Sequence, residues 1–265
     1  MQFALNHMVA PSLGYEAFFD LAKGLGIGAV EIRNDIATSR MDAASAKNIK
    51  RLADDRGLTI ISVNALQRFN HWSAKRAEEA GELAAYAAEA GAKALVLCPV
   101  NDTAFTPAMA ERLAGLRESL AGLAPILKRH GVKGLVEPLG FAECSLRLKS
   151  EAVAAIAAVG VPDQFSLVHD TFHHFVAGEK EMFPQRTGLV HISGVTDGAQ
   201  TAATMRDPHR ILVDARDLID NKGQMKKLSV GGYSGPFSFE PFAAEVHRDA
   251  NIARSLAASR DYLSA

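Results

Sequence analysis

The chain has 265 residues, of which 48% are hydrophobic and 22% are charged, and this composition excludes a disordered or low-complexity protein. The 29 Lys and Arg residues against 30 Asp and Glu residues leave a net charge of -1, so no overall charge attracts the chain to nucleic acid or to an anionic membrane. Its two cysteines, Cys98 and Cys144, are too few for a disulfide scaffold. We find no signal peptide and no apolar run of bilayer length, and therefore expect a cytoplasmic protein.

Apolar, β-branched segments recur along the chain at a spacing of roughly 30 residues. Their near-continuous hydrophobic character is typical of strands in a parallel sheet that helices cover. The eight predicted strands are 3–8, 29–33, 58–66, 93–100, 133–139, 165–170, 188–194 and 236–242.

Helical patterns lie between these strands. In segment 107–129, leucines at steps of three and four residues form one apolar stripe, and Ala-rich segments predict further helices at 43–56, 75–90, 149–159 and 247–262. Glycines that precede a strand predict helix ends, because glycine readily adopts the left-handed conformation that closes a helix. These glycines are Gly57, Gly91, Gly131 and Gly160.

Strands that alternate with helices predict parallel βαβ units. Eight units predict one (β/α)8 TIM barrel as a single domain over 1–265, since such a barrel needs roughly 250 residues. The alternative is an open doubly wound sheet. Segment 24–30 is glycine-rich but lies between a helix and a strand, the reverse of the order in a dinucleotide-binding loop. The longest irregular segment is 195–213, and loops of that length are often functional.

Functional groups of a barrel lie at the carboxyl ends of its strands. Four consecutive predicted strands carry ionisable residues there, namely Glu137, Asp170, His191 and Glu240. Pro138 and Pro241 follow the two glutamates, and a proline keeps the residue before it extended. Three crowded carboxylates repel one another, which a divalent cation relieves. This ligand set suits Mn²⁺, Mg²⁺ or Co²⁺, with Zn²⁺ as a further candidate. The alternative is four separate ion-pair partners.

Other polar residues near the strand ends predict a substrate-binding wall. The expected contacts are His173, Arg210, Glu143, Arg206, Asn64 and His7, with His173 on the loop that leaves the sixth strand. Glu31 and Arg33 end the second strand and are candidates for the same wall, while Phe69 and Trp72 are candidates for an apolar lid. For each of these residues alone, a solvated or packing role is the alternative. Cys98 is interpreted as a buried structural thiol.

The motifs around these residues resemble the xylose isomerase-like superfamily of sugar isomerases and epimerases. They are LVEPLG with Glu137, HDTFHH with Asp170 and His173, VHISG with His191, and SFEPF with Glu240. The resemblance covers essentially the whole chain. Within the superfamily it is greatest to the bacterial inosose (2-keto-myo-inositol) isomerases of inositol catabolism, and the segments that carry this likeness are EIR, NAL and EPLGFAECS. It implies that these two glutamates, Asp170 and His191 bind the metal, and that His173 and Arg210 bind substrate. Residues 213–216 depart from the Pro-Gly-x-Gly common after the loop arginine.

We therefore predict a metal-dependent isomerase or epimerase of a polyhydroxy ketone. Glu137 and Glu240 would form the acid–base pair, one removing the α-proton to give an enediolate and the other returning a proton. The alternatives are a dehydratase of a related polyol acid, an endonuclease IV-like phosphodiesterase, which the net charge disfavours, and a non-catalytic sugar-binding protein. The expected partner is a small polyol or ketose, with no nucleic acid and no membrane, and a homo-oligomer is left open.

Overall fold

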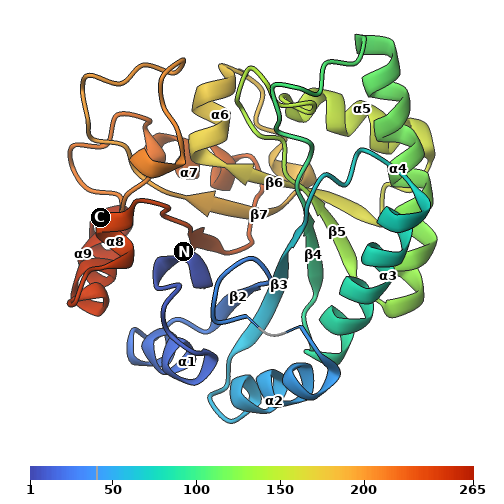
Figure 1. Ribbon diagram of the computed structural model, residues 1–265. Helices are drawn as coiled ribbons and strands as arrows, with labels where there is room; N and C mark the ends of the chain where they lie inside the picture. The colour runs from blue at the N-terminus through green and yellow to red at the C-terminus, as the bar shows by residue number, and fades with distance from the viewer. Residues whose placement is uncertain (40) are drawn as a thin grey trace.

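The computed structural model describes residues 1–39 and 41–265. Eight parallel strands form a closed barrel in chain order, with helices around its outside (Figure 1). The strands are β1 (Phe3–Asn6), β2 (Ala29–Arg33), β3 (Thr59–Leu66), β4 (Ala94–Leu97), β5 (Lys133–Val136), β6 (Phe165–Asp170), β7 (Thr187–Ile192) and β8 (Phe237–Phe239). The predicted (β/α)8 barrel is confirmed, and the open sheet is excluded because β1 pairs with both β2 and β8.

The helices follow the strands in alternation. They are α1 (Tyr15–Gly24), α2 (Ala43–Asp54), α3 (Ala74–Glu89), α4 (Met109–His130), α5 (Lys149–Val159), α6 (Thr171–Ala177), α7 (Asn221–Val230), α8 (Ala244–His247) and α9 (Ile252–Ser264), with single 3-10 turns at His7–Val9, Pro184–Arg186 and Asp207–His209. The helix predicted over 247–262 starts later, at Ile252, because the short α8 precedes it. In the described part of the chain, none of these helices combines the length and apolar character needed to cross a bilayer.

The predicted helix stops are confirmed by the backbone. Gly57, Gly91, Gly131 and Gly160 all have φ between 67° and 74°, where a Cβ atom would be strained. The glycine-rich segment 24–30 also separates a helix from a strand, since α1 ends at Gly24 and β2 begins at Ala29. It is therefore a helix stop and not a phosphate-binding loop.

Alternation along each strand divides the buried residues into two cores. Outward residues pack with the helices in one large cluster, whereas inward residues fill the barrel itself. The inward cluster comprises Ala65, Ala94, Val96, Cys98, Leu135, Val168 and Leu189. Near the carboxyl ends of the strands, the inward positions change from apolar to polar: Leu135, Val168 and Leu189 are each followed two residues later by an ionisable side chain. On β5, β6 and β7 the interior of the barrel is therefore apolar, and the charged side chains lie above this apolar layer.

The irregular segment after β7 folds back onto the end of that strand. Gly194 and Ile211 exchange two backbone hydrogen bonds of 2.7 and 2.8 Å in an antiparallel bridge. Backbone amides of Phe242 and Ala243, just beyond β8, donate to the carbonyl of Arg210. These bonds hold Arg210 over the mouth of the barrel.

Candidate metal centre and its cavity

Four predicted ligands converge at the carboxyl end of the barrel. Glu137, Asp170, His191 and Glu240 are all buried, and one ligand atom from each lies within 4.8 Å of the others. The strand register produces this convergence, because Asp170 of β6 is the direct partner of His191 in β7. All four side chains also fall on the inward set of the alternation, so they point at a common centre.

The two Glu-Pro pairs extend the sheet by one residue. The Glu137 amide donates to the carbonyl of Leu97 in β4, and the Glu240 amide donates to the carbonyl of Ile192 in β7. The next residue in each case is a proline, which has no amide hydrogen and cannot continue the ladder. Each glutamate is therefore the last extended residue of its strand, and its side chain is placed inward at the mouth.

Carboxylates surround His191 on both sides of its ring. Nδ1 lies 2.8 Å from Glu137 Oε1 and 3.2 Å from Glu240 Oε2, while Nε2 lies 3.2 Å from the carboxylate of Glu31. Burial alone would lower the pKa of His191, but the charges of Glu240, Glu31 and Glu137 raise this pKa well above its usual value. The imidazole thus sits in a field that strongly favours a positive charge at the centre of the cluster.

Two buried arginines balance part of the negative charge. Arg210 Nη2 lies 2.6 Å from Asp170 Oδ2 and 3.0 Å from Glu240 Oε2, and Arg33 Nη1 lies 2.7 Å from Glu240 Oε1. Burial opposes ionisation of Glu240, but His191, Arg210 and Arg33 hold the pKa of Glu240 well below its usual range. Glu240 is therefore an ionised carboxylate at neutral pH.

The residues fit a divalent cation. With Glu31 included, four buried carboxylates share the interior with two buried guanidinium groups, and a divalent cation would offset the excess of negative charge around His191. Three carboxylates and one imidazole are ligands that Mn²⁺, Co²⁺, Mg²⁺ and Zn²⁺ accept. Asp170 Oδ2 and Glu240 Oε2 each accept from Arg210 and retain a second lone pair, so the contacts with Arg210 do not prevent coordination.

A cavity of about 320 Å³ opens above this cluster. Its charged and polar lining includes Arg33, Asn64, Glu137, His173, Arg210 and Glu240. Phe141 and Phe242 add apolar surface to the same wall. Both glutamates of the cluster face this space, so a molecule bound in the cavity would touch them directly.

Three of the expected substrate contacts line this cavity, namely Asn64, His173 and Arg210. The Nδ2 atom of Asn64 is buried and has no hydrogen-bond partner in the structure. A buried amide donor without a partner destabilises the folded state. At a cavity wall such a donor is suited to donate a hydrogen bond to an oxygen of a bound ligand. The Nδ1 atom of His173 is likewise buried without a partner among the described residues, so Asn64 and His173 are the contacts that the geometry supports most directly.

The other three expected contacts lie elsewhere. His7 is fully buried, donates from Nε2 to the Leu13 carbonyl at 2.9 Å, and stacks on Phe18 with ring centroids 4.2 Å apart. Glu143 and Arg206 lie 3.9 Å apart at the outer rim, where the Arg206 side chain is 47% exposed. These three residues are outside the lining of the cavity as the structure describes it.

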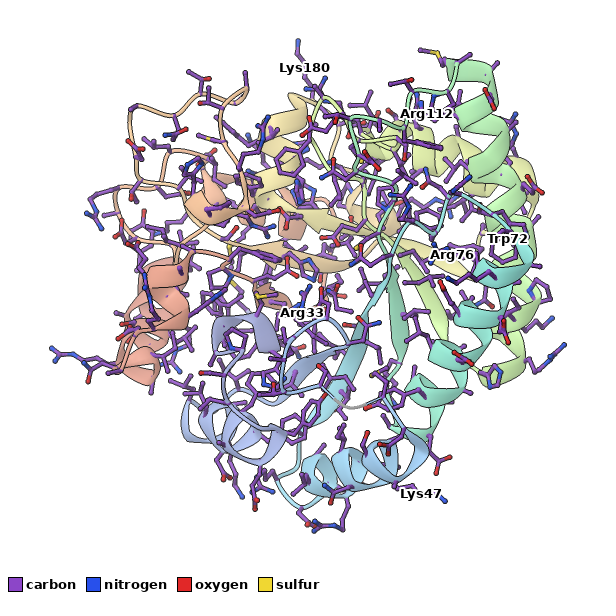
Figure 2. The ribbon with its side chains drawn as sticks, in the orientation of Figure 1. Arg33, Lys47, Trp72, Arg76, Arg112 and Lys180 are labelled. Carbon is purple, nitrogen blue, oxygen red and sulfur yellow. The ribbon has the colours of Figure 1, made fainter. Side chains whose placement is uncertain are left out.

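Two further predictions are corrected. His173 does not lie on a loop: α6 begins at Thr171, directly after β6, and the Asp170 carboxylate caps it by accepting from the His173 amide at 2.9 Å. The predicted lid is also wrong, since Phe69 is completely buried in the outer core and Trp72 packs on Gly122 of α4. Figure 2 shows Trp72 beside α4 at the outside of the barrel, well away from Arg33.

Of the two wall candidates from the second strand, Arg33 lines the cavity, whereas Glu31 lies in a polar layer directly under the cluster that the sequence did not predict. Glu31 accepts hydrogen bonds from Ser62 Oγ, Ser238 Oγ and Asn6 Nδ2, and it faces His191. The available signal was a charged residue inside an apolar strand, AVEIR, because such residues are rarely buried without a partner. Cys98 is buried as predicted, but its Sγ also donates to Glu137 Oε2 at 3.4 Å and lines the cavity.

The fold and the cluster together define a (β/α)8 barrel with a carboxylate–imidazole centre at its mouth. The family model for the xylose isomerase-like TIM barrel matches residues 19–262, and the chain belongs to this family. No curated protein matches the chain by sequence.

Solved structures give the same assignment. A xylose isomerase domain-containing protein from Salmonella typhimurium LT2 is 33% identical, with a TM-score of 0.90 over 100% of this chain and 97% of its own. An IolI protein whose structure holds a zinc atom is 19% identical, with a TM-score of 0.87 over 99% and 96% of the two chains. D-psicose 3-epimerase from Clostridium cellulolyticum H10, solved with D-tagatose, is 16% identical, with a TM-score of 0.78 over 100% and 98%. The last two likenesses show the shared fold.

Proposed function

We propose that the chain is a divalent-metal-dependent isomerase or epimerase of a polyhydroxy ketone, with an inosose or a ketose as substrate. One observation carries the proposal: Glu137 and Glu240 face the same cavity from strand ends separated by two strands, with Asp170 and His191 between them. The IolI protein with its zinc supports the divalent cation, and the psicose epimerase with its ketohexose supports the substrate class.

A cation held by Glu137, Asp170, His191 and Glu240 would polarise the ketone oxygen and so acidify the neighbouring C–H bond. The residues of this chain supply the proton transfers. One glutamate removes the α-proton and the other returns a proton, either at the neighbouring carbon or on the opposite face. Asn64 and His173 line the same cavity and would orient the hydroxyl groups of the substrate.

The surroundings of the two glutamates differ, and this assigns their roles. Both oxygens of Glu240 accept from arginines, and Asn6 Nδ2 adds a third donor at 3.1 Å, so its carboxylate is a weak base. Glu137 Oε1 lies 2.8 Å from His191 Nδ1, its Oε2 receives the weak donor Cys98 Sγ, and none of the described arginines donates to it. We therefore assign the first proton abstraction from the ketone to Glu137.

The test begins with metal analysis of the purified protein. A panel of inososes and ketoses is then incubated with the Mn²⁺-loaded protein in D₂O and followed by NMR. Isomerisation or epimerisation would exchange a carbon-bound proton for deuterium without loss of oxygen. Glu137→Gln and Glu240→Gln should each lower turnover by at least about 10²-fold, the usual contribution of an acid–base group. The matched control is Glu143→Gln, which changes an acidic residue at the rim.

Other outcomes would overturn the proposal. Near-native turnover in both Glu137→Gln and Glu240→Gln would show that these residues are not the acid–base pair. Loss of water from a polyol acid in the same NMR experiment would make the protein a dehydratase, and cleavage of abasic DNA would make it a phosphodiesterase. Binding of the sugar without any exchange, in protein stripped of metal, would leave a sugar-binding protein.

A further inference from the structure

Glu31 is a carboxylate at the centre of the barrel, one layer below the predicted ligands. It is completely buried and comes from β2, and its four contacts come from four other strands. Asn6 of β1 and Ser62 of β3 donate to it at 3.3 and 2.6 Å, Ser238 of β8 donates to its Oε1, and His191 of β7 lies 3.2 Å away. No contact of this kind is needed to close the barrel, since the backbone ladder does so already.

The donors around Glu31 determine which nitrogen of His191 carries a proton. An ionised carboxylate only accepts hydrogen bonds, so the His191 nitrogen that faces Glu31 must be a donor. That nitrogen is Nε2. The other nitrogen, Nδ1, faces Glu137 and Glu240 at 2.8 and 3.2 Å, and these two residues belong to the ligand set that converges on the cation site. A cation held there would take the place of the proton on Nδ1, because a ligating imidazole nitrogen must be deprotonated, while Nε2 keeps its proton toward Glu31.

Glu31 is itself poorly suited to bind the cation. Ser62 and Asn6 occupy one oxygen each, and the carboxylate lies on the far side of the His191 ring from Glu137. The four residues whose ligand atoms converge within 4.8 Å do not include it. Carboxylates that hold the second nitrogen of a ligating imidazole orient the ring and strengthen the ligand.

From this geometry we infer that Glu31 is a positioning residue for the metal centre, which holds Nε2–H of His191 and presents the Nδ1 lone pair to the cation. The inference rests on the proposed function only in requiring that Glu137, Asp170, His191 and Glu240 bind a divalent cation.

The first test uses the wild-type protein, labelled with ¹⁵N in its histidine rings and loaded with Zn²⁺. We expect the ring of His191, assigned by comparison with His191→Gln, to show a protonated Nε2 and a metal-bound Nδ1. A metal-bound Nε2, or a proton on Nδ1 with Zn²⁺ present, would overturn the inference. This measurement depends on no Glu31 variant and holds even if such variants fold poorly.

The second test measures Zn²⁺ affinity by calorimetry in three variants. Glu31→Leu removes the acceptor and should weaken Zn²⁺ binding by about 10–100-fold, the usual effect of losing such a partner. Glu31→Gln can keep an acceptor oxygen toward Nε2, so its loss should be smaller than that of Glu31→Leu. Ser62→Ala removes one donor to Glu31 and leaves the His191 contact in place, so its Zn²⁺ affinity should stay within about threefold of wild type.

The results separate this inference from the proposed function. If the wild-type protein binds no divalent cation at this centre, the proposed function fails. If wild type binds Zn²⁺ and folded Glu31→Leu binds it equally well, with an unchanged His191 spectrum, only the role of Glu31 fails. Weaker binding in Glu31→Leu with a disturbed His191 ring supports both.

Discussion

The guanidinium of Arg210 lies 2.6 Å from the carboxylate of Asp170, although the two residues are 40 positions apart and Arg210 belongs to the irregular segment after β7. The same Nη2 atom lies 3.0 Å from Glu240. Arg210 therefore contacts two proposed metal ligands at once, and its ring-stacking contacts with Phe172 and Phe242 keep it in place. The affinity of the centre for a cation and the stability of the segment that carries Arg210 should therefore depend on each other.

Replacement of Arg210 by methionine should destabilise the metal-depleted protein more than the metal-loaded protein. Removal of one partner from a buried ion pair typically costs about 3–5 kcal/mol, because the carboxylates that remain are not compensated. A divalent cation replaces part of the lost positive charge. We expect urea unfolding in EDTA to show most of this loss and unfolding with Mn²⁺ to recover part of it.

The control for this prediction is Arg216→Met. Arg216 lies on the same segment and pairs with Asp214, but its side chain is 73% exposed. Exposed pairs contribute at most about 1 kcal/mol, with or without a cation. Equal losses in EDTA and in Mn²⁺ for Arg210→Met would contradict the prediction.

Asp170→Asn should abolish most of the stabilisation by metal while keeping the fold. Asparagine caps a helix about as well as aspartate, so the first turn of α6 should survive. For wild type, a cation at 100 times its Kd should add about 2.7 kcal/mol to the free energy of unfolding. Chemical unfolding with and without Mn²⁺ measures the difference. Glu143→Gln should keep the full stabilisation by Mn²⁺. If Asp170→Asn is stabilised by Mn²⁺ as much as wild type, the metal does not bind at Asp170.

Asn64→Ala should raise KM for the substrate and cost little stability. Among the described residues the Nδ2 atom of Asn64 has no hydrogen-bond partner, so truncation to alanine removes no hydrogen bond of this atom from the folded state. Asn34→Ala is the matched control, because its amide exchanges two hydrogen bonds with the backbone of Ala65, at 3.0 and 2.8 Å. That variant should unfold more easily and keep its KM more nearly unchanged. Kinetics and urea unfolding of both variants decide the matter, and the reverse pattern would contradict it.

Acid should destabilise the fold through His7. Burial lowers the pKa of His7 to about 4, against an ordinary value of 6.5. Between these two values the unfolded chain binds a proton that the folded chain does not, so stability falls as pH falls from 6.5 to 4. The contribution is on the order of 2–3 kcal/mol at the acid end.

The slope of unfolding free energy against pH tests this assignment. Between pH 6.5 and 4, His7→Gln should lower the number of protons bound on unfolding, which the slope gives, by up to one, whatever its effect on overall stability. His71→Gln, which changes an exposed histidine, should leave the slope as in wild type. An unchanged slope in His7→Gln would show that other groups cause the acid sensitivity.

The sequence predicted the barrel and the converging ligands because both leave local signals. Strand segments bounded by glycine recur at regular spacing, and Glu-Pro pairs mark the ends of β5 and β8. Once the fold is a barrel, the carboxyl ends of consecutive strands must meet, so Glu137 and Glu240 could be placed without any long-range information.

The rest depends on contacts that no local pattern encodes. The pairing of Glu31 with His191 joins strands that are 160 residues apart, and the register across β1 and β8 determines it. Trp72 lies on α4 because Gly122 leaves room for its ring, which is a feature of another helix. The strand pattern predicts a loop at His173, whereas Asp170 serves as both strand end and helix cap, with no connecting residue between β6 and α6.

That direct junction implies a sequence of events in catalysis. Asp170, a proposed metal ligand, also caps the first turn of α6 and so fixes the backbone of His173. A cation held by Asp170 would restrain this carboxylate further, so His173 would be held more firmly before any ketone binds. The junction of β6 and α6 at Asp170 therefore favours an order in which the cation binds first and the sugar second. Sugar added to EDTA-treated protein should bind only weakly.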